Sequence, residues 1–582
     1  MECRKLGYEI VESLDFRGDV KGFEIKGVSE ELQERFSKLT HDIDEEIARQ
    51  ERNLGRALTA AGHDVSLETR SFKLAETDSA AVRNHQLEQL SREEMELLQK
   101  LVQESFQRER RRKENRSAEQ AIDEVLPELF EQQSVMKTEQ ILAEVLTRNL
   151  GKIPLAELQT ALSKHPELRK LPENYMIPLA VMEAEQYAFD AIERERGLYA
   201  PLNVHFRAFE GEKNRASQRE AVQGILRSRD RFVLLRGVAG SGKTSTLKEL
   251  ARGLAQAPRV LAPTNSAVEV LKREGFPHSQ TVAGFLLRPP EFNGLVIVDE
   301  SGLNSLRDGV ALLRLAEEKQ LRILFVGDSL QHHAVERGDF FHLLEEHSQI
   351  KRFSLTEIHR QQKEEYRLGV KACADGNFAE AFERFDRNGF LHENGAGYLK
   401  MTAKRFVGLY HREQVIAVAP THRECDALTA EIRARLPLGK IVQTPSVFRS
   451  ARFSRARLRN PKTYHPGQTV MFVRKMKNIA EAGTVAEIVK RNCLHLSNGK
   501  LLRLPGAADY IAVGERRPME LRQGDVIQFQ VNLREQKIFN GNLARITGTP
   551  GVVELLKQDM NPVADSLRHL PADFAGYDYG WG

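Results

Sequence analysis

The chain has 582 residues, which at roughly 150 residues per domain predicts three to five domains. Its formal net charge is only +4 although 29% of its residues are charged, so a nucleic-acid surface must come from local clusters of basic side chains. The sequence has no apolar run long enough to cross a bilayer, no secretory signal at its start and no CxxC pair among its four cysteines. We therefore expect a cytoplasmic protein with no membrane insertion, no disulfide framework and no zinc site.

The first 200 residues read as two helical regions. Residues 1–120 are highly charged, and Leu32, Phe36 and Leu39 fall on one apolar stripe of a predicted helix. Residues 121–200 follow as short amphipathic helices, which predict a small helical domain. Residues 121–200 contain no chemically distinctive motif. The basic run RERRRKENR before them is more typical of an exposed helix or linker than of a contact with a phosphate backbone.

From residue 201 the pattern changes to apolar, β-branched strands that alternate with helices. Residues 201–345 contain RFVLLRG, PRVLAPT, GLVIVDE and LRILFVGD, and such continuous apolar runs predict a parallel sheet covered on both faces, with ligand groups at the carboxyl ends of the strands. The segment EQVIAVAPTHRECDALTAEIRARL predicts a second α/β unit, whose first part is 346–445. Residues 446–525 read as a small β-barrel inserted in that unit, and 526–582 as the return to it.

A phosphate-binding loop is predicted after the first of these strands. The segment GVAGSGKT fits the pattern GxxxxGK[ST], and it lies between a predicted strand and a predicted helix, as the motif requires. Backbone N–H groups and the helix N-terminus would surround the phosphates, Lys243 would reach the β- and γ-phosphates, and the Thr244 hydroxyl would ligate Mg²⁺. The alternative is a tight turn that binds no ligand. The predicted nucleotide-binding residues of the loop are Gly237, Gly240, Ser241, Gly242, Lys243, Thr244 and Ser245.

Polar residues also follow two later strands. In LVIVDES, Asp299 is placed to hold Mg²⁺, directly or through water, and Glu300 to orient and deprotonate the attacking water. In FVGDSLQ, Gln331 is placed to sense the γ-phosphate. The alternative for this last segment is that Asp328 or Gln331 caps the next helix.

Two further side chains are assigned by their positions relative to these motifs. Arg360, in LTEIHRQ, is predicted to reach the transition-state phosphate across an interdomain cleft, although an arginine there can also be a plain surface residue. Gln218, in NRASQREAVQGIL, precedes the phosphate loop at a distance suited to hydrogen-bonding an adenine edge, or it lies on a solvated helix face. The predicted ligands are therefore ATP and Mg²⁺.

A nucleotide site split between two α/β units suggests a motor, and its track would be a single strand of nucleic acid. Thr264 and Asn265, in APTNSAVEVL, are predicted to contact phosphates at a strand end. FRSARFSRARLRNPKTYHPGQ interleaves arginines, among them Arg452 and Arg455, with aromatic residues, which suits a groove that follows a backbone and stacks bases. A flexible basic linker is the open alternative for this stretch.

Taken together, GVAGSGKTS, APTNSAV, IVDES, VGDSLQ and LTEIHRQ resemble the RecD-like branch of superfamily 1 helicases. Within it, the chain resembles the helicase half of MobF conjugative relaxases of the TrwC/TraI type. LGYEI…GFEIKGVSEELQERFSKL is similar to the tail of that family's relaxase domain, and YHPGQTVMFVRK to its SH3-like insert. The resemblance implies an α/β P-loop NTPase with tandem RecA-like parallel-sheet domains, the second one incomplete, an inserted SH3-like β-barrel and an α-helical N-terminal region.

The same resemblance implies a function. It is that of an ATP-hydrolysing 5′-to-3′ translocase on single-stranded DNA that unwinds plasmid DNA in conjugation, with plasmid transfer and coupling proteins as partners. Lys243, Glu300, Gln331 and Arg360 would carry out hydrolysis.

The family's catalytic tyrosine and three-histidine cluster would precede this chain, and a GYAxTxHxxQG motif would follow its end. We therefore expect a segment truncated at both ends, without a nicking or histidine metal site, and its full helicase activity is not assured. The alternatives are a RecD-like repair helicase, and an ATP- and DNA-binding remnant without productive unwinding.

Overall fold

The structure is a computed structural model in which two compact units are described separately. One comprises Val125–Ala143 and Gln159–His392, and the other Met1–Glu124, Glu144–Leu158 and Glu393–Gly582. No helix among the described residues is both long and apolar enough to span a bilayer. The described residues are 3, 6–14, 20–29, 31–33, 87–108, 117–150, 152–212, 215–238, 240–331, 334–357, 363–410, 415–490, 492–496, 499–533, 535–557, 562–570 and 576–579.

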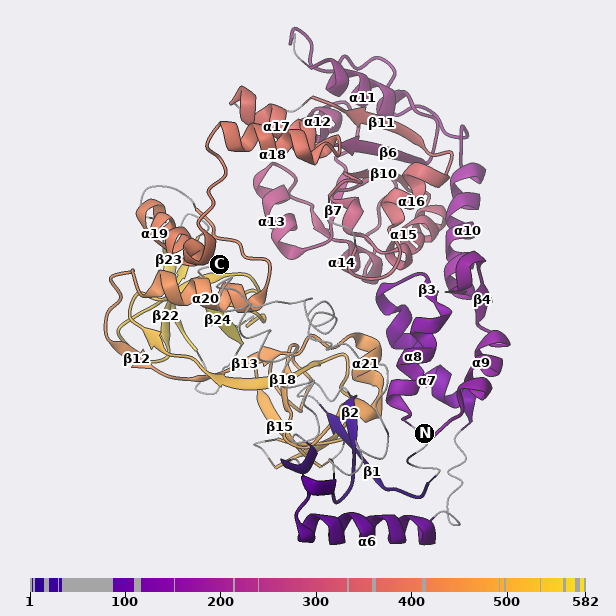
Figure 1. Ribbon diagram of the computed structural model, residues 1–582. Helices are drawn as coiled ribbons and strands as arrows, with labels where there is room; N and C mark the ends of the chain where they lie inside the picture. The colour runs from indigo at the N-terminus through magenta and orange to yellow at the C-terminus, as the bar shows by residue number, and fades with distance from the viewer. Residues whose placement is uncertain are drawn as a thin grey trace. The chain divides into compact units, whose positions relative to one another are not determined.

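A six-stranded parallel sheet forms the centre of the first unit (Figure 1). The predicted apolar runs become its four inner strands, so the parallel sheet expected from the sequence is confirmed. A parallel pairing needs a crossover connection, and helices fill that role between these strands. In spatial order the strands are β11 (Lys351–Leu355), β6 (Phe232–Gly237), β10 (Arg322–Gly327), β9 (Leu295–Val298), β7 (Arg259–Ala262) and β8 (Gln280–Thr281).

Helices cover both faces of this sheet, because successive residues of each inner strand point to opposite faces. Phe232 and Leu234 of β6 join one apolar core, and Val233 and Leu235 join the other. In Figure 1, α11 and α12 lie on one side of the sheet and α10, α15 and α16 on the other. From Leu179 onward, the described α-helices of this unit are α10 (Leu179–Arg194), α11 (Ala216–Arg227), α12 (Lys243–Arg252), α13 (Asn265–Arg273), α14 (Val282–Leu287), α15 (Leu306–Lys319), α16 (Phe340–His347), α17 (Glu364–Ala374) and α18 (Phe378–Arg387).

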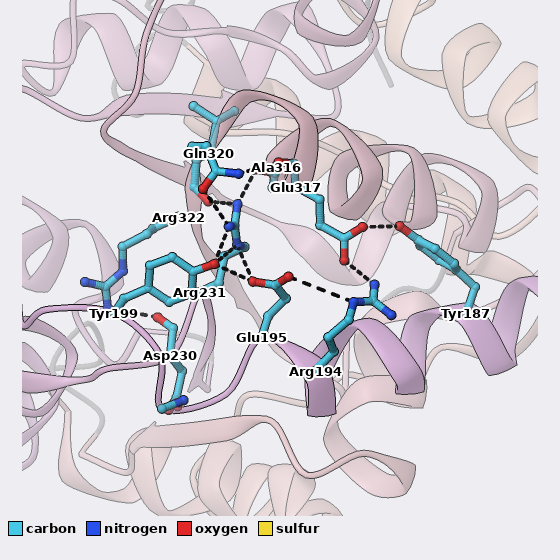
Figure 2. A network of polar contacts seen from close by, with 12 residues as sticks. Tyr187, Arg194, Glu195, Tyr199, Asp230, Arg231, Ala316, Glu317, Gln320 and Arg322 are labelled. Carbon is cyan, nitrogen blue, oxygen red and sulfur yellow. Dashed lines mark hydrogen bonds and ion pairs between the residues drawn. The ribbon is translucent and has the colours of Figure 1, made fainter.

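A buried polar network attaches the end of α10 to the amino ends of β6 and β10 (Figure 2). Arg231 is 2% exposed, and its Nε lies 2.8 Å from Oε2 of Glu195. The same guanidinium donates to the Tyr199 hydroxyl, to the amide oxygen of Gln320 and to the carbonyl of Ala316. The network lies at the opposite end of the sheet from the carboxyl ends of the strands, so it supports the fold away from the ligand groups.

Small sheets occur in regions that the sequence predicted to be helical. A hairpin of β1 (Ile10–Leu14) and β2 (Val20–Ile25) precedes α6 (Arg92–Arg108). A three-stranded sheet, β3 (Met136–Lys137), β5 (Tyr175–Pro178) and β4 (Leu168–Lys170), lies among the helices that follow. Strands of two to six residues are too short to leave a clear period in the sequence, which is why they were missed. The helices of this region are α7 (Ala118–Gln132), α8 (Thr138–Arg148) and α9 (Leu155–Ser163). Phe36 and Leu39 of the predicted stripe lie outside the described residues.

After Glu393, every pairing between described strands is antiparallel. The β domain expected over 446–525 is a six-stranded sheet with the order β13 (Ser446–Ser450), β18 (Ile511–Pro518), β14 (Thr469–Phe472), β15 (Val485–Lys490), β16 (Cys493–His495) and β17 (Leu501–Arg503). Its two outer strands, β13 and β17, do not pair with each other, so the expected closure into a barrel is not among the described pairings. The helices of this part are α19 (Tyr398–Tyr410), α20 (His422–Arg433) and α21 (Arg455–Arg459).

The parallel sheet expected for a second RecA-like unit is also not among the described pairings. Residues 415–419 alternate between buried and exposed as a strand would, with Ile416 76% and Val418 82% exposed, but they pair with no described strand. The strands after residue 526 form an antiparallel sheet instead, because short turns such as the one between β21 and β22 allow only antiparallel pairing. In spatial order they are β23 (Pro562–His569), β22 (Val552–Leu556), β21 (Leu543–Ile546), β20 (Val526–Phe529) and β24 (Tyr577–Tyr579), and a separate pair joins β12 (Ile441–Gln443) to β19 (Leu521–Arg522).

Candidate nucleotide site

The loop between β6 and α12 has the backbone shape that its glycines permit. Gly240 has φ 82° and Gly242 has φ 79°, in the left-handed region that favours glycine. At Gly237 the constraint is space, because a Cβ there would lie 2.7 Å from Oγ of Ser241 and 2.8 Å from Cγ of Lys243. The loop therefore folds tightly over its own first residue, directly before the N-terminus of α12.

Polar groups of this loop fit the predicted phosphates. The ammonium of Lys243 donates to the carbonyl of Gly237 over 2.6 Å, so the side chain bends back over the loop. Ser241 is 1% exposed, and its hydroxyl has no hydrogen-bond partner among the described residues. A buried donor of this kind is satisfied by an anion oxygen, and the N-terminus of α12 favours negative charge at the same place. Thr244 is the second residue of α12, one turn from Ser241.

Gln218 lies against the backbone of the phosphate loop. The alternative interpretation, a position on a solvated helix face, is wrong. It is 1% exposed on α11, and its side-chain amide donates to the carbonyls of Ser241 and Gly242 at 3.4 and 3.2 Å. Its amide oxygen accepts from Arg215, which also donates to the Ser245 hydroxyl over 2.7 Å. Both ends of the Gln218 amide are therefore engaged with the loop and its support. No sequence motif selects Arg215, because its role depends on α11 packing beside α12.

The two acidic residues lie at the carboxyl end of β9, as predicted. Glu300 is exposed, has φ 52°, and donates its backbone N–H to Oδ1 of Asp299 over 3.0 Å. Burial raises the pKa of Asp299 to about 6; the hydrogen bond from Glu300 and the charge of Lys243 oppose this rise, and the charge of Glu300 adds to it. A carboxylate held in this environment is stabilised by a cation, which is the property required of a Mg²⁺ ligand.

Gln331 is held by the turn that follows β10. Its side-chain amide donates to Oδ2 of Asp328 over 2.8 Å, and its backbone N–H donates to the carbonyl of the same residue. The next described helix, α16, is capped by Asp339, so the alternative in which Asp328 or Gln331 caps that helix is wrong. Arg360 lies outside the described residues.

One cavity joins these groups at the carboxyl edge of the sheet. Its volume is about 780 Å³, and it is lined from three strand ends and from α13. The lining residues include Gly240, Ser241, Gly242, Lys243, Thr244, Asp299, Glu300, Asp328 and Gln331. The structure therefore brings together the phosphate loop, the two acidic residues and Gln331.

The predicted DNA-contacting residues lie at two other places. Thr264 caps α13, where its hydroxyl accepts from the N–H of Ala267, and Asn265 follows it in the first turn. In the other unit, Arg452 is exposed just before α21, and Arg455 is exposed at the first position of that helix.

The basic stretch around these arginines is part of a folded domain. It contains β13 and α21, so the alternative interpretation of this stretch as a flexible linker is wrong. Phe448 and Tyr464 are buried, 1% and 0% exposed, so they belong to the core and do not form a stacking surface. Phe453 is stacked under the guanidinium of Arg457, with 4.1 Å between that group and the ring centre.

Comparison with known proteins gives two family matches and two curated relatives. Residues 213–396 match the model of an AAA domain, and residues 1–93 match the model of the TrwC relaxase. The multifunctional conjugation protein TraI of Escherichia coli K12 is 29% identical over 206 residues, which is 32% of this chain and 12% of that protein. A second TraI of E. coli is 28% identical over the same share. The chain thus spans about an eighth of the length of these relatives.

Solved structures of a Pif1 helicase from Bacteroides are also similar to the chain. One, bound to single-stranded DNA, has a TM-score of 0.32 and 16% identity, over 60% of this chain and 74% of that one. Another, in complex with ADP-AlF3 and single-stranded DNA, has a TM-score of 0.32 and 15% identity, over 63% and 81%.

The TrwC relaxase match and the AAA match lie one after the other on this chain, and the two curated relatives are both named as multifunctional conjugation proteins. The nucleotide motifs fall within the AAA match, and the segment LGYEI falls within the relaxase match. The chain therefore joins a segment similar to the TrwC relaxase to a segment that matches an AAA domain.

Proposed function

We propose that the chain is an ATP-dependent DNA helicase or translocase segment of a conjugative relaxase, acting 5′ to 3′ on single-stranded DNA in plasmid transfer. The observation that carries the proposal is the single cavity lined by Lys243, Asp299, Glu300 and Gln331. The TrwC relaxase match at residues 1–93 favours this role over that of a RecD-like repair helicase.

Each group in the cavity has a role in hydrolysis. The loop amides and Lys243 bind the phosphates, and Gln331 senses the γ-phosphate from the turn after β10. Glu300 takes the proton of the attacking water, whose oxygen bonds to the γ-phosphorus while the bond to the β-phosphate oxygen breaks and ADP leaves. Thr244 and Asp299 would hold Mg²⁺, which neutralises charge on the phosphates when bound. Arg360 would add a second cation at the γ-phosphate.

Magnesium-dependent ATP hydrolysis by the purified chain, with and without single-stranded DNA, tests this proposal. We expect turnover stimulated by DNA, and a loss of about 100- to 1000-fold in Lys243→Ala, since one electrostatic group aimed at a transition state contributes that much. Lys248→Ala is the matched control. Lys248 lies on α12, as Lys243 does, and its ammonium forms an ion pair with the carboxylate of Glu274.

Two results would contradict this proposal. Turnover that persists in Lys243→Ala would remove the phosphate loop from the mechanism. A folded chain that binds ATP and DNA but shows no turnover would be the ATP- and DNA-binding remnant without productive unwinding.

A further inference from the structure

Three side chains of α16 bring metal-binding atoms together outside the nucleotide cavity. His342, Glu345 and Glu346 each offer one ligand atom, and these atoms all lie within 4.8 Å of one another. Their spacing of three and four residues places them on one side of the helix. None of the three lines the nucleotide cavity. The sequence predicted no metal site here, because the patterns that indicate one are paired cysteines and clustered histidines, whereas this set combines one imidazole with two carboxylates.

A second observation concerns Glu345 alone. The residue is 4% exposed, and its Oε1 accepts a hydrogen bond from Arg236 over 3.2 Å. Its other oxygen, Oε2, is buried and has no hydrogen-bond partner among the described residues. Leaving a buried carboxylate oxygen without a partner costs free energy, so a native protein satisfies such an atom with a donor or a cation. The set around it offers ligands for a cation.

We propose that His342, Glu345 and Glu346 form a binding site for a divalent transition-metal ion, with zinc as the best match. The imidazole favours zinc over magnesium or calcium, which take oxygen ligands, and two carboxylates complete a common type of ligand set. Three protein ligands leave a fourth position for water. The hydrogen bond from Arg236 to Oε1 fixes the carboxylate plane and leaves Oε2 for the metal, as an outer-shell partner does.

The geometry requires only a small adjustment. Bonds of about 2.0–2.2 Å to zinc put tetrahedral ligand atoms roughly 3.4 Å apart. In the structure the three ligand atoms lie within 4.8 Å of one another, so they would have to move closer together by at most about 1.4 Å. His342 and Glu346 are exposed, so both side chains can rotate toward the fixed, buried carboxylate of Glu345. The site would therefore assemble on α16 without a change in the core beneath it.

Zinc binding to the full chain tests the proposal. The protein is stripped with a chelator, transferred to buffer without nucleotide, and titrated with zinc in a calorimeter. We expect one equivalent bound, and at least tenfold weaker binding in both His342→Ala and Glu346→Gln, whose exposed positions leave folding intact. Cobalt in place of zinc should give the visible absorption of a tetrahedral ion, which both variants lose.

His347→Ala is the matched control, since it removes the neighbouring exposed imidazole of the same helix, which is not in the ligand set. It should bind zinc as the unaltered chain does, and so should Lys243→Ala, which makes the result independent of the proposed ATPase. The proposal is overturned if the unaltered chain binds no equivalent of zinc, if His342→Ala and Glu346→Gln bind it undiminished, or if His347→Ala loses it.

Discussion

The carboxyl of Asp299 is ionised at neutral pH only at a cost to the folded protein. Burial raises its pKa to about 6 from an ordinary value of 3.8. Because the folded-state pKa is the higher one, this cost is fully present above pH 6, and it disappears as the pH falls below the unfolded value. A bound cation would offset it, which couples magnesium binding at this residue to the stability of the unit.

Replacing Asp299 by Asn should therefore stabilise the protein without magnesium while impairing hydrolysis. We expect a gain of roughly 1–3 kcal/mol in the free energy of unfolding at pH 8, and no gain near pH 4. The free energy of unfolding is measured by urea titration, with hydrogen exchange of the amides in β9 and β10 as the probe. Both pH values are measured with a chelator present. An equal gain at the two pH values would show that the charge of Asp299 is not the cause.

Gln218 can act on the loop or on the base, and the two roles predict different kinetics. Its side-chain amide donates hydrogen bonds to the carbonyls of Ser241 and Gly242, so Gln218→Ala should loosen the loop whichever nucleotide is bound. We expect kcat/KM to fall about fivefold for ATP and GTP alike, since one hydrogen bond contributes about 1 kcal/mol. A loss confined to ATP would establish the adenine contact instead. Gln223→Ala, on the same helix, controls for a general effect on α11.

At the scale of elements, α10 depends on one buried cation. Arg231 is 2% exposed and joins Glu195, Tyr199, Gln320 and the end of α15 in the network of Figure 2. Removing that cation would leave the Glu195 carboxylate, 14% exposed, without its closest charged partner. Removing one member of a buried pair costs far more than removing an exposed one.

We therefore expect Arg231→Met to lower the free energy of unfolding by about 3 kcal/mol. Arg194→Met should lower it by less than about 1 kcal/mol, because its side chain is 50% exposed although it pairs with Glu317. Thermal unfolding of both variants beside the unaltered chain makes the comparison. Similar losses in the two variants would show that burial of Arg231 does not set its contribution.

In the parallel sheet, the sequence predicted the strands that are buried on both faces and missed the exposed edge strand. Strands such as β9 and β10 are apolar at nearly every position because cores lie on both sides of them. Strand β11 pairs with β6 at the edge of the same sheet, is largely exposed and has no apolar run, so its sequence carried no signal. The second parallel sheet was inferred from one strand-like segment, 415–419, but pairing partners depend on tertiary contacts that a single segment does not encode.

The candidate site was predictable to the same extent. Lys243, Asp299 and Gln331 follow strands, and parallel strands deliver their carboxyl ends to one edge, so their meeting could be expected. The support that Arg215 gives the loop could not, because it depends on how α11 packs against α12.

For the whole molecule, the question is whether the second unit contributes to the proposed binding of single-stranded DNA. Arg452, just before α21, and Arg455, its first residue, are both exposed there. Arg459, the last residue of α21, pairs with Asp509 over 3.1 Å. If Arg452 and Arg455 contact phosphates, changing both to Ala should weaken binding to a single-stranded oligonucleotide about tenfold. The slope of log affinity against log salt concentration should become shallower by the amount that roughly two phosphate contacts contribute.

Fluorescence anisotropy at several salt concentrations measures this effect. Arg459→Ala should change the affinity and the salt dependence little, because its charge is already paired. An unchanged salt dependence in the double variant would place the DNA contacts elsewhere on the chain.

The order of strands in the parallel sheet also has a consequence for synthesis on the ribosome. Strand β6, which leads into the phosphate loop, pairs with β10 and β11, and these strands come about 90 and 120 residues later in the chain. Until Leu355 has emerged, β6 therefore lacks the neighbours that satisfy its backbone N–H and C=O groups. A nascent chain that stops before this point would expose an apolar strand and an unsupported loop, and it should depend on chaperones where the completed unit does not.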